Sequence, residues 1–165
     1  MATALAGALV FAADQLTKLW VRSAFHEEEV AVVVRGFLNL TYVRNRGGAF
    51  GIFPHQQALF IVLSFATIAV LVWFHRGIGA HHRLCRIALG MILGGAVGNL
   101  ADRLMVDRER CVIDWIDVHW GAYHWPAFNI ADSAISVGVI LLLYYLMLNA
   151  ETKPARGAAA PPPEG

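Results

Sequence analysis

The sequence predicts an all-α membrane protein with four transmembrane helices and a small loop rich in β-strands. Of its 165 residues, 58% are hydrophobic and only 15% are charged, whereas a soluble domain carries about 25% charged residues. Four apolar runs are each long enough to cross a bilayer, which takes roughly 17–25 residues of helix. The length suits a single domain, and the net charge of +1 does not support nucleic-acid binding.

The four runs and their connections form one predicted membrane-embedded domain, residues 1–150. The first run is interpreted as a retained helix and not a signal peptide, because it lacks a basic start and is interrupted by Asp14 and Lys18. The loop at 22–57 contains "VAVVVRGFLNLTYVRN", whose valine-rich, partly alternating pattern predicts short strands. The tail at 151–165 is of low complexity and is predicted to be disordered. The predicted spans are 2–21, 58–74, 84–104 and 129–148.

A short basic turn at 75–83 and a Trp-rich loop at 105–128 complete the connections. Arginines occur on both sides of the spans, so the positive-inside rule leaves the orientation open. The two cysteines, Cys85 and Cys111, are predicted at opposite ends of the bundle and belong to no CxxC pair. We therefore expect neither a disulfide nor a zinc site built on cysteine.

Ionisable residues of three spans are predicted to meet at one end of the bundle, because consecutive spans alternate in direction. Such residues cost a few kcal/mol or more near the bilayer centre, so they are candidates for function. For two of them, Asp14 and Asp102, an ion pair with Lys18 or Arg103 is an equally good structural explanation. The residues at this end are Asp14, Lys18, Asp102, Arg103 and Asp132.

The third span carries two distinct faces. Gly90, Gly94 and Gly98 recur every four residues, a pattern that predicts close packing against another helix. A second face, with spacing i, i+4, i+7 and i+8, points polar groups into the bundle. Its members are Gly95, Asn99, Asp102 and Arg103.

Two aspartates, Asp114 and Asp132, are expected near the same rim. Two carboxylates in a low dielectric cannot both ionise cheaply, so they share a proton, and one acts as a base while the other acts as an acid. That is the equipment of an aspartic peptidase, which needs no metal or other cofactor. Taken singly, Asp132 could be only a favourable helix start, and Asn129 could cap the same helix.

Other chemistries remain as alternatives. A metal hydrolase could use a set of residues in the Trp-rich loop, although their spacing matches no usual ligand pattern. We treat one of these residues, Asp117, as solvated. A non-catalytic membrane binder of lipidated peptides and a small ion or proton pathway are the further alternatives. The metal-hydrolase set is Asp114, Asp117, His119 and His124.

The order of motifs resembles the lipoprotein signal peptidases (signal peptidase II) of bacteria over about residues 10–148. The motifs are "DQLTK", "NRGGAFG", "GGAVGNLADR", "VIDWIDVHW" and "FNIADSAI". The departures are Gly48 in place of the more usual alanine, Trp115 in place of phenylalanine, and Asp117 as an additional acid. None of these removes a group that the chemistry requires.

The resemblance implies that Asp114 and Asp132 are the catalytic pair of a membrane aspartic endopeptidase. Its substrate would be a diacylglyceryl-modified prolipoprotein, cut just before the lipidated cysteine, and its other partners would be membrane lipids. The remaining family positions would bind substrate or support the site. They are Asp14, Lys18, Asn45, Gly95, Asn99, Asp102, Arg103, Asn129 and Ala131.

The resemblance also implies a place in the cell. The protein would lie in the bacterial inner (plasma) membrane, crossing it several times with both termini cytoplasmic. Independently of the resemblance, we expect a monomer. The loops at 22–57 and 105–128, and with them the active site, would lie on the extracytoplasmic (periplasmic) side. No cofactor and no metal are expected.

Overall fold

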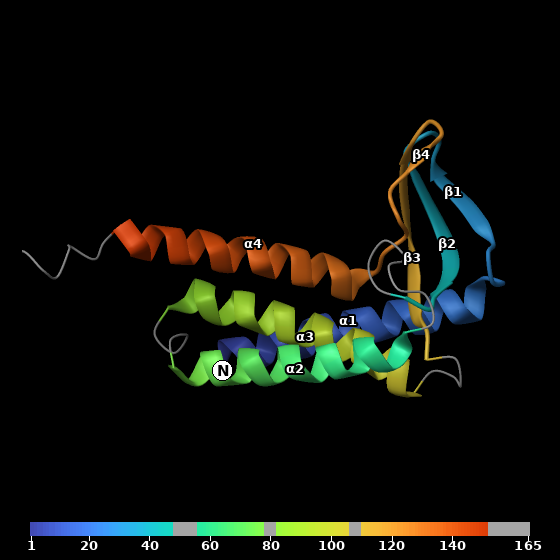
Figure 1. Ribbon diagram of the computed structural model, residues 1–165. Helices are drawn as coiled ribbons and strands as arrows, with labels where there is room; N and C mark the ends of the chain where they lie inside the picture. Colours follow the sequence, from blue (N-terminus) through green and yellow to red (C-terminus); the bar gives the residue numbers. More distant parts are fainter. Residues whose placement is uncertain (48–55, 78–81, 106–109, 152–165) are drawn as a thin grey trace, which may run out of the picture.

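The computed structural model describes residues 1–47, 56–77, 82–105 and 110–151. Its four long helices run side by side, and a small sheet lies across one end of them (Figure 1). All four are long and apolar enough to cross a membrane, and each matches its predicted span to within a few residues. Within the described residues the predicted four-helix architecture is therefore confirmed. The helices are α1 (Ala2–Ala24), α2 (Gln57–Gly77), α3 (Arg83–Met105) and α4 (Ile130–Glu151).

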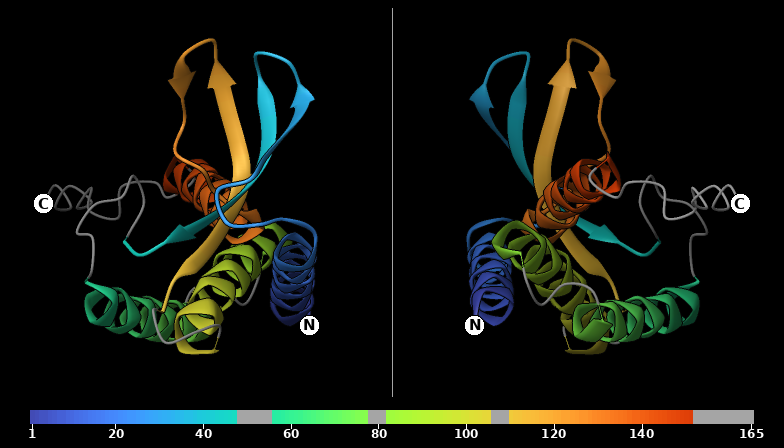
Figure 2. Two further views of the ribbon diagram at one scale, coloured as in Figure 1. Left: turned by 90° about the vertical axis from the view of Figure 1, so that its right-hand side faces the viewer. Right: turned by 90° about the vertical axis from the view of Figure 1, so that its left-hand side faces the viewer.

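Helix α3 is the centre of the bundle and packs against α1, α2 and α4 (Figure 2). Its glycines permit the close approach of α1, as the four-residue repeat predicts. A Cβ atom on Gly94 would lie 2.4 Å from the carbonyl oxygen of Gly7, and one on Gly90 would lie 2.4 Å from that of Thr3. On the other face, a Cβ on Gly95 would lie 2.5 Å from the carbonyl oxygen of Ala131 in α4.

The sheet has four antiparallel strands in the order β1-β2-β3-β4. The short strands predicted in the loop at 22–57 are confirmed, and they are β1 (Val30–Val34) and β2 (Leu38–Asn45). Strands are not predicted in the Trp-rich loop at 105–128, but it supplies β3 (Val112–Trp120) and β4 (Tyr123–His124). Polar residues and tryptophans interrupt the apolar alternation of this segment, and its pairing with β2 is not local in sequence.

The outer surface of the helices is apolar. Large apolar side chains on the outside of the helices are exposed, among them Val62 and Trp73 of α2, as expected for helices whose solvent is lipid. Cys85 and Cys111 are both buried, and no disulfide joins them. The predicted tail, apart from Glu151 at the end of α4, lies outside the described residues, as do Gly48 and the rest of "GAFG".

Candidate active site

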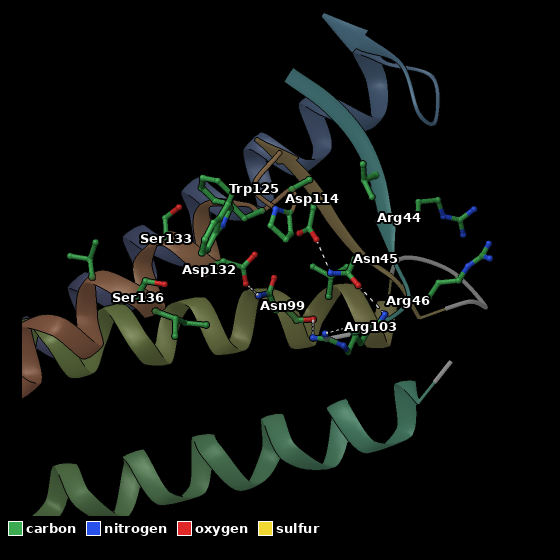
Figure 3. Close-up of a pocket in the computed structure, with 18 residues that line it drawn as sticks. Arg44, Asn45, Arg46, Asn99, Arg103, Asp114, Trp125, Asp132, Ser133 and Ser136 are labelled. Atoms are coloured by element: carbon green, nitrogen blue, oxygen red, sulfur yellow. Dashed lines mark hydrogen bonds between the residues drawn. The ribbon is translucent and has the colours of Figure 1, made fainter. Parts of the chain in front are cut away.

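A cavity of about 730 Å³ lies where the sheet meets α3 and α4. Both Asp114 and Asp132 line it, and Figure 3 shows their side chains entering it from a strand and from a helix. Asn45, Asn99 and Arg103 line it as well. The other predicted site residues lie behind this lining, next to the aspartates and not in the cavity wall.

Asp114 lies on the central strand β3, directly opposite Val43 of β2. Its side chain is buried, and each of its carboxylate oxygens accepts a hydrogen bond. Asn45 Nδ2 donates to Oδ2 at 2.9 Å, and Asn129 Nδ2 donates to Oδ1 at 2.7 Å. The strand therefore holds this carboxyl between two amides at the cavity wall.

The pKa of the Asp114 carboxyl is raised to about 7. Burial is the largest cause, because it disfavours the charged form, and the negative charge of Asp132 adds to it. The hydrogen bonds from Asn45 and Asn129 and the positive charge of Lys18 act in the opposite direction. A carboxyl in this state can hold or release a proton near neutral pH, as general acid–base catalysis requires.

Asp132 lies in the first turn of α4, where its backbone N–H donates to Asn129 Oδ1 at 3.0 Å. In return the backbone N–H of Asn129 donates to Asp132 Oδ2 at 3.2 Å. This reciprocal pair is a capping box, and it confirms the predicted cap at Asn129. The other carboxylate oxygen, Oδ1, accepts from Asn99 Nδ2 at 2.8 Å, so one oxygen is fixed by the helix start and the other by α3.

Two amides connect the aspartates to each other. Asn129 Nδ2, which contacts Asp114, also lies 3.1 Å from Asn99 Oδ1, and Asn99 Nδ2 in turn donates to Asp132. Both asparagines are buried. A continuous polar chain thus runs from one carboxyl to the other.

Behind this chain lies a buried ion cluster. Lys18 Nζ is 2.8 Å from Asp14 Oδ2 and 2.8 Å from Asp102 Oδ2. Of the two partners that the sequence offered for Asp102, Lys18 and Arg103, the structure shows the ion pair with Lys18. Ala131, in the first turn of α4, donates its backbone N–H to Asp14 Oδ1 at 3.0 Å. Gly95 lets the same turn of α4 approach α3.

Arg103 is one of three arginines among the described residues that line the cavity, with Arg44 and Arg46. Its guanidinium donates to the carbonyl oxygens of Asn99 and Gly47, both at 3.3 Å, and lies 5.4 Å from the ring centroid of Phe60. These contacts hold the positive charge close to both aspartates, with which it interacts electrostatically.

Sequence reasoning missed two features of the site. Gln15 Nε2 lies 3.1 Å from both Asp14 Oδ2 and Asp102 Oδ1; its place inside "DQLTK" was the available signal. One wall of the cavity is formed by the segment Trp125–Phe128, and the carbonyl oxygen of Phe128 accepts from the backbone N–H groups of Trp115 and Ile116.

The interpretation of Asp117 as solvated is wrong. Its side chain is only 13% exposed and accepts from Asn39 Nδ2 at 2.8 Å, with His124 Nδ1 also at 2.8 Å. Burial raises the pKa of this carboxyl, but the contacts with His124 and Asn39 outweigh it and the pKa is lowered. Three residues along the strand from Asp114, Asp117 points to the opposite face of the sheet. Within the described ranges, no three His, Cys, Asp or Glu side chains are grouped closely enough to hold a metal ion.

A family model described as signal peptidase (SPase) II matches residues 6–148. The chain belongs to this family. It is therefore a protease, and its four apolar helices make it a multi-pass membrane protein.

Named relatives agree with this membership. The chain is 46% identical over 138 residues to the lipoprotein signal peptidase of Syntrophotalea carbinolica, covering 82% of this chain and 84% of the relative. It is 39% identical over 150 residues to that of Desulforapulum autotrophicum, covering 88% and 91%. A solved bacterial membrane enzyme, determined by the in meso method at 2.3 Å resolution, superposes with a TM-score of 0.83 at 28% identity, covering 95% and 94%.

Proposed function

We propose that the protein is a membrane aspartic endopeptidase that removes signal peptides from diacylglyceryl-modified prolipoproteins, cutting just before the lipidated cysteine. The observation that carries the proposal is the pair Asp114 and Asp132 lining one cavity and joined through Asn99 and Asn129. The relatives' name, lipoprotein signal peptidase, supports the substrate class.

The reaction uses the pair with one proton between them. The ionised carboxylate takes a proton from a water molecule, whose oxygen attacks the carbonyl carbon of the scissile peptide. The protonated carboxyl donates to the carbonyl oxygen, so the tetrahedral intermediate forms without a free oxyanion. The proton taken from water then passes to the leaving nitrogen and the C–N bond breaks. As the carbonyl re-forms, a hydroxyl of the intermediate returns its proton to the other carboxylate, so the pair again holds one proton. The raised pKa of Asp114, about 7, supports a proton held on the pair near neutral pH.

The other site residues fall into two groups by position. Asn45, Asn99 and Arg103 line the cavity, so they can hydrogen-bond the extended backbone of the substrate, and the Arg103 guanidinium offsets the charge of the pair. The second group supports the aspartates from behind. It consists of Asp14, Lys18, Gly95, Asp102, Asn129 and Ala131.

The proposed orientation puts both termini in the cytoplasm and the cavity at the extracytoplasmic face of the inner membrane. The start of α1 and the end of α4 lie at the same end of the bundle, the one away from the sheet (Figure 1), which supports placing both termini on one side. A single chain carries both aspartates, which supports a monomer. Lipids of the membrane would surround the exposed apolar faces and admit the diacylglyceryl chains from the side.

The two non-peptidase alternatives fit the structure less well. A proton or ion pathway needs polar groups along a whole span, whereas the buried ionisable side chains of the described helices gather near the sheet. A passive binder has no need of two carboxyls at one cavity with a proton shared near neutral pH.

Cleavage of a lipidated prolipopeptide by the purified protein in a chelator-containing buffer tests the proposal. The same peptide with an unmodified cysteine is the matched control substrate. We expect one cut before the lipidated cysteine, identified by mass spectrometry, no effect of the chelator, and at least about a tenfold lower kcat/KM without the lipid, since its binding energy is lost. Loss of wild-type activity in chelator would indicate a metal hydrolase instead, and equal cleavage of both peptides would contradict the substrate class.

A further inference from the structure

The ion cluster behind the cavity uses every proton of one ammonium group. Lys18 Nζ lies 2.8 Å from Asp14 Oδ2, 2.8 Å from Asp102 Oδ2 and 2.9 Å from Asn99 Oδ1, and an ammonium has three N–H donors. The Lys18, Asp14 and Asp102 side chains are at most 2% exposed. The geometry of this cluster is therefore closely determined.

Each carboxylate of the cluster holds the backbone of one aspartate segment. Asp14 Oδ1 accepts from the N–H of Ala131, the residue immediately before Asp132, at 3.0 Å. Asp102 Oδ2 accepts from the N–H of Ile113, the residue immediately before Asp114, at 3.1 Å. Lys18 thus links two carboxylates, and each of these binds the backbone of the residue that precedes Asp132 or Asp114.

Two further contacts tighten this arrangement. Gln15 Nε2 lies 3.1 Å from both Asp14 and Asp102 and so bridges the two carboxylates. Gly98 allows Asp14 to approach α3, since a Cβ atom there would lie 2.5 Å from Asp14 Oδ2.

We propose that Lys18, Asp14 and Asp102 form a positioning hub that sets the separation of Asp114 and Asp132 and does not contact the substrate. The inference rests on the proposed function and assigns these three residues a role within it. Buried ion pairs are a poor source of stability compared with apolar packing of the same volume; what this one supplies is a fixed geometry between a strand and a helix. Among the described residues, the cavity lining includes Asn99 but none of the three hub residues.

The matched variants are Asp14→Asn and Asp102→Asn, with Asp117→Asn as the control. All three make the same chemical change at a hydrogen-bonded, shielded carboxylate, but Asp117 lies outside the hub. We expect each hub variant to lower kcat about 10- to 100-fold, the range for a displacement of reacting groups by up to about 1 Å. KM should stay within about twofold, because these residues do not contact substrate. The control should keep wild-type kcat.

A pair of aspartates that is active with one proton gives a bell-shaped dependence of kcat on pH. The width of this bell distinguishes a displaced aspartate from the simple loss of a nearby charge. Removing one negative charge shifts both limbs together, whereas a larger separation of two coupled carboxyls brings the limbs closer. We expect the profile of each hub variant to narrow by at least about half a pH unit. The kcat of the double variant, Asp14→Asn with Asp102→Asn, should be only a little lower than that of the more impaired single variant. Displacing either Asp114 or Asp132 already changes the distance between them.

Lys18→Met is the harsher test, because it removes the cation that links both hub carboxylates. Its control for loss of charge is Arg22→Met, at an exposed position of the same helix. A hub variant that raises KM tenfold at unchanged kcat would assign its residue to substrate binding. The positioning role would be contradicted if Asp14→Asn and Asp102→Asn both kept the wild-type kcat and the wild-type width of the pH profile, whatever their thermal stability. If the wild type leaves the lipidated peptide uncut, the proposed function fails separately. Infrared titration of the Asp114 and Asp132 carboxyls without substrate then tests the positioning role. The interval between their two titration steps is expected to shrink in the hub variants.

Discussion

Asp132→Asn is expected to lower kcat for the lipidated prolipopeptide by roughly 10³-fold or more, because the amide can neither take a proton from water nor return it. Peptide binding should persist, since Asn99, Asn45 and Arg103 still line the cavity. Single-turnover cleavage and equilibrium binding, measured on the same preparation, separate the two effects. Asp114→Asn should behave in the same way.

Asp117→Asn is the control for this loss. It makes the same change on the same strand as Asp114, but its carboxylate bonds to Asn39 and His124 and lies outside the cavity lining. It should cleave at close to the wild-type rate. The paired-aspartate mechanism would be contradicted if Asp132→Asn kept more than about a tenth of wild-type activity. That is well above what remains after loss of an acid–base group.

The second large effect is expected at the contact between α1 and α3. In Gly94→Ala the new Cβ would lie 2.4 Å from the carbonyl oxygen of Gly7 and 2.9 Å from its Cα. Both are backbone atoms, so the helices must separate, which carries Lys18 away from Asp102. We expect a loss of about 1–3 kcal/mol of unfolding free energy, typical of overpacking, and at least about a tenfold loss of kcat from the displaced site. Thermal unfolding in detergent and the cleavage assay measure the two.

Gly7→Ala is the matched control, because it adds the same methyl group to the facing helix. Its Cβ would lie 3.2 Å from the carbonyl oxygen of Gly90, a tight contact that a shift of a few tenths of an ångström relieves. We expect a clearly smaller loss of stability than in Gly94→Ala. Equal stability of the two variants would mean that the close approach at Gly94 is not what holds α1 and α3 together.

Local spacing made the helical half of the site predictable. Asp14 and Lys18 are one turn apart, the cap at Asn129 precedes an apolar run, and Gly90 and Gly94 repeat at helical spacing. All of these concern neighbours within one helix or one helix face, and the structure confirms them.

The sheet half was not predictable from local pattern. The sequence pattern places Asp114 in a loop, but it lies on β3 because that segment pairs with β2, some seventy residues earlier in the chain. Alternation along β3 is mixed, with Asp117 and His119 on the face opposite Asp114, so the period-two signal was weak. The partners of Asp117 come from β2 and β4, and no pattern within one segment could identify them.

The pH profile of lipidated-peptide cleavage by the wild type shows whether Asp114 and Asp132 work as a pair that holds one proton. A pair of aspartates is active while it holds one proton, and the pKa of Asp114 is raised to about 7. Activity should therefore rise from acid pH as the first proton leaves, and then fall as the pH increases through about 7, when the second leaves. We therefore expect a bell-shaped pH profile with a descending limb near neutrality. A rate that climbs to a plateau in alkali, as for a serine deprotonated by a base or a metal-bound hydroxide, would contradict it.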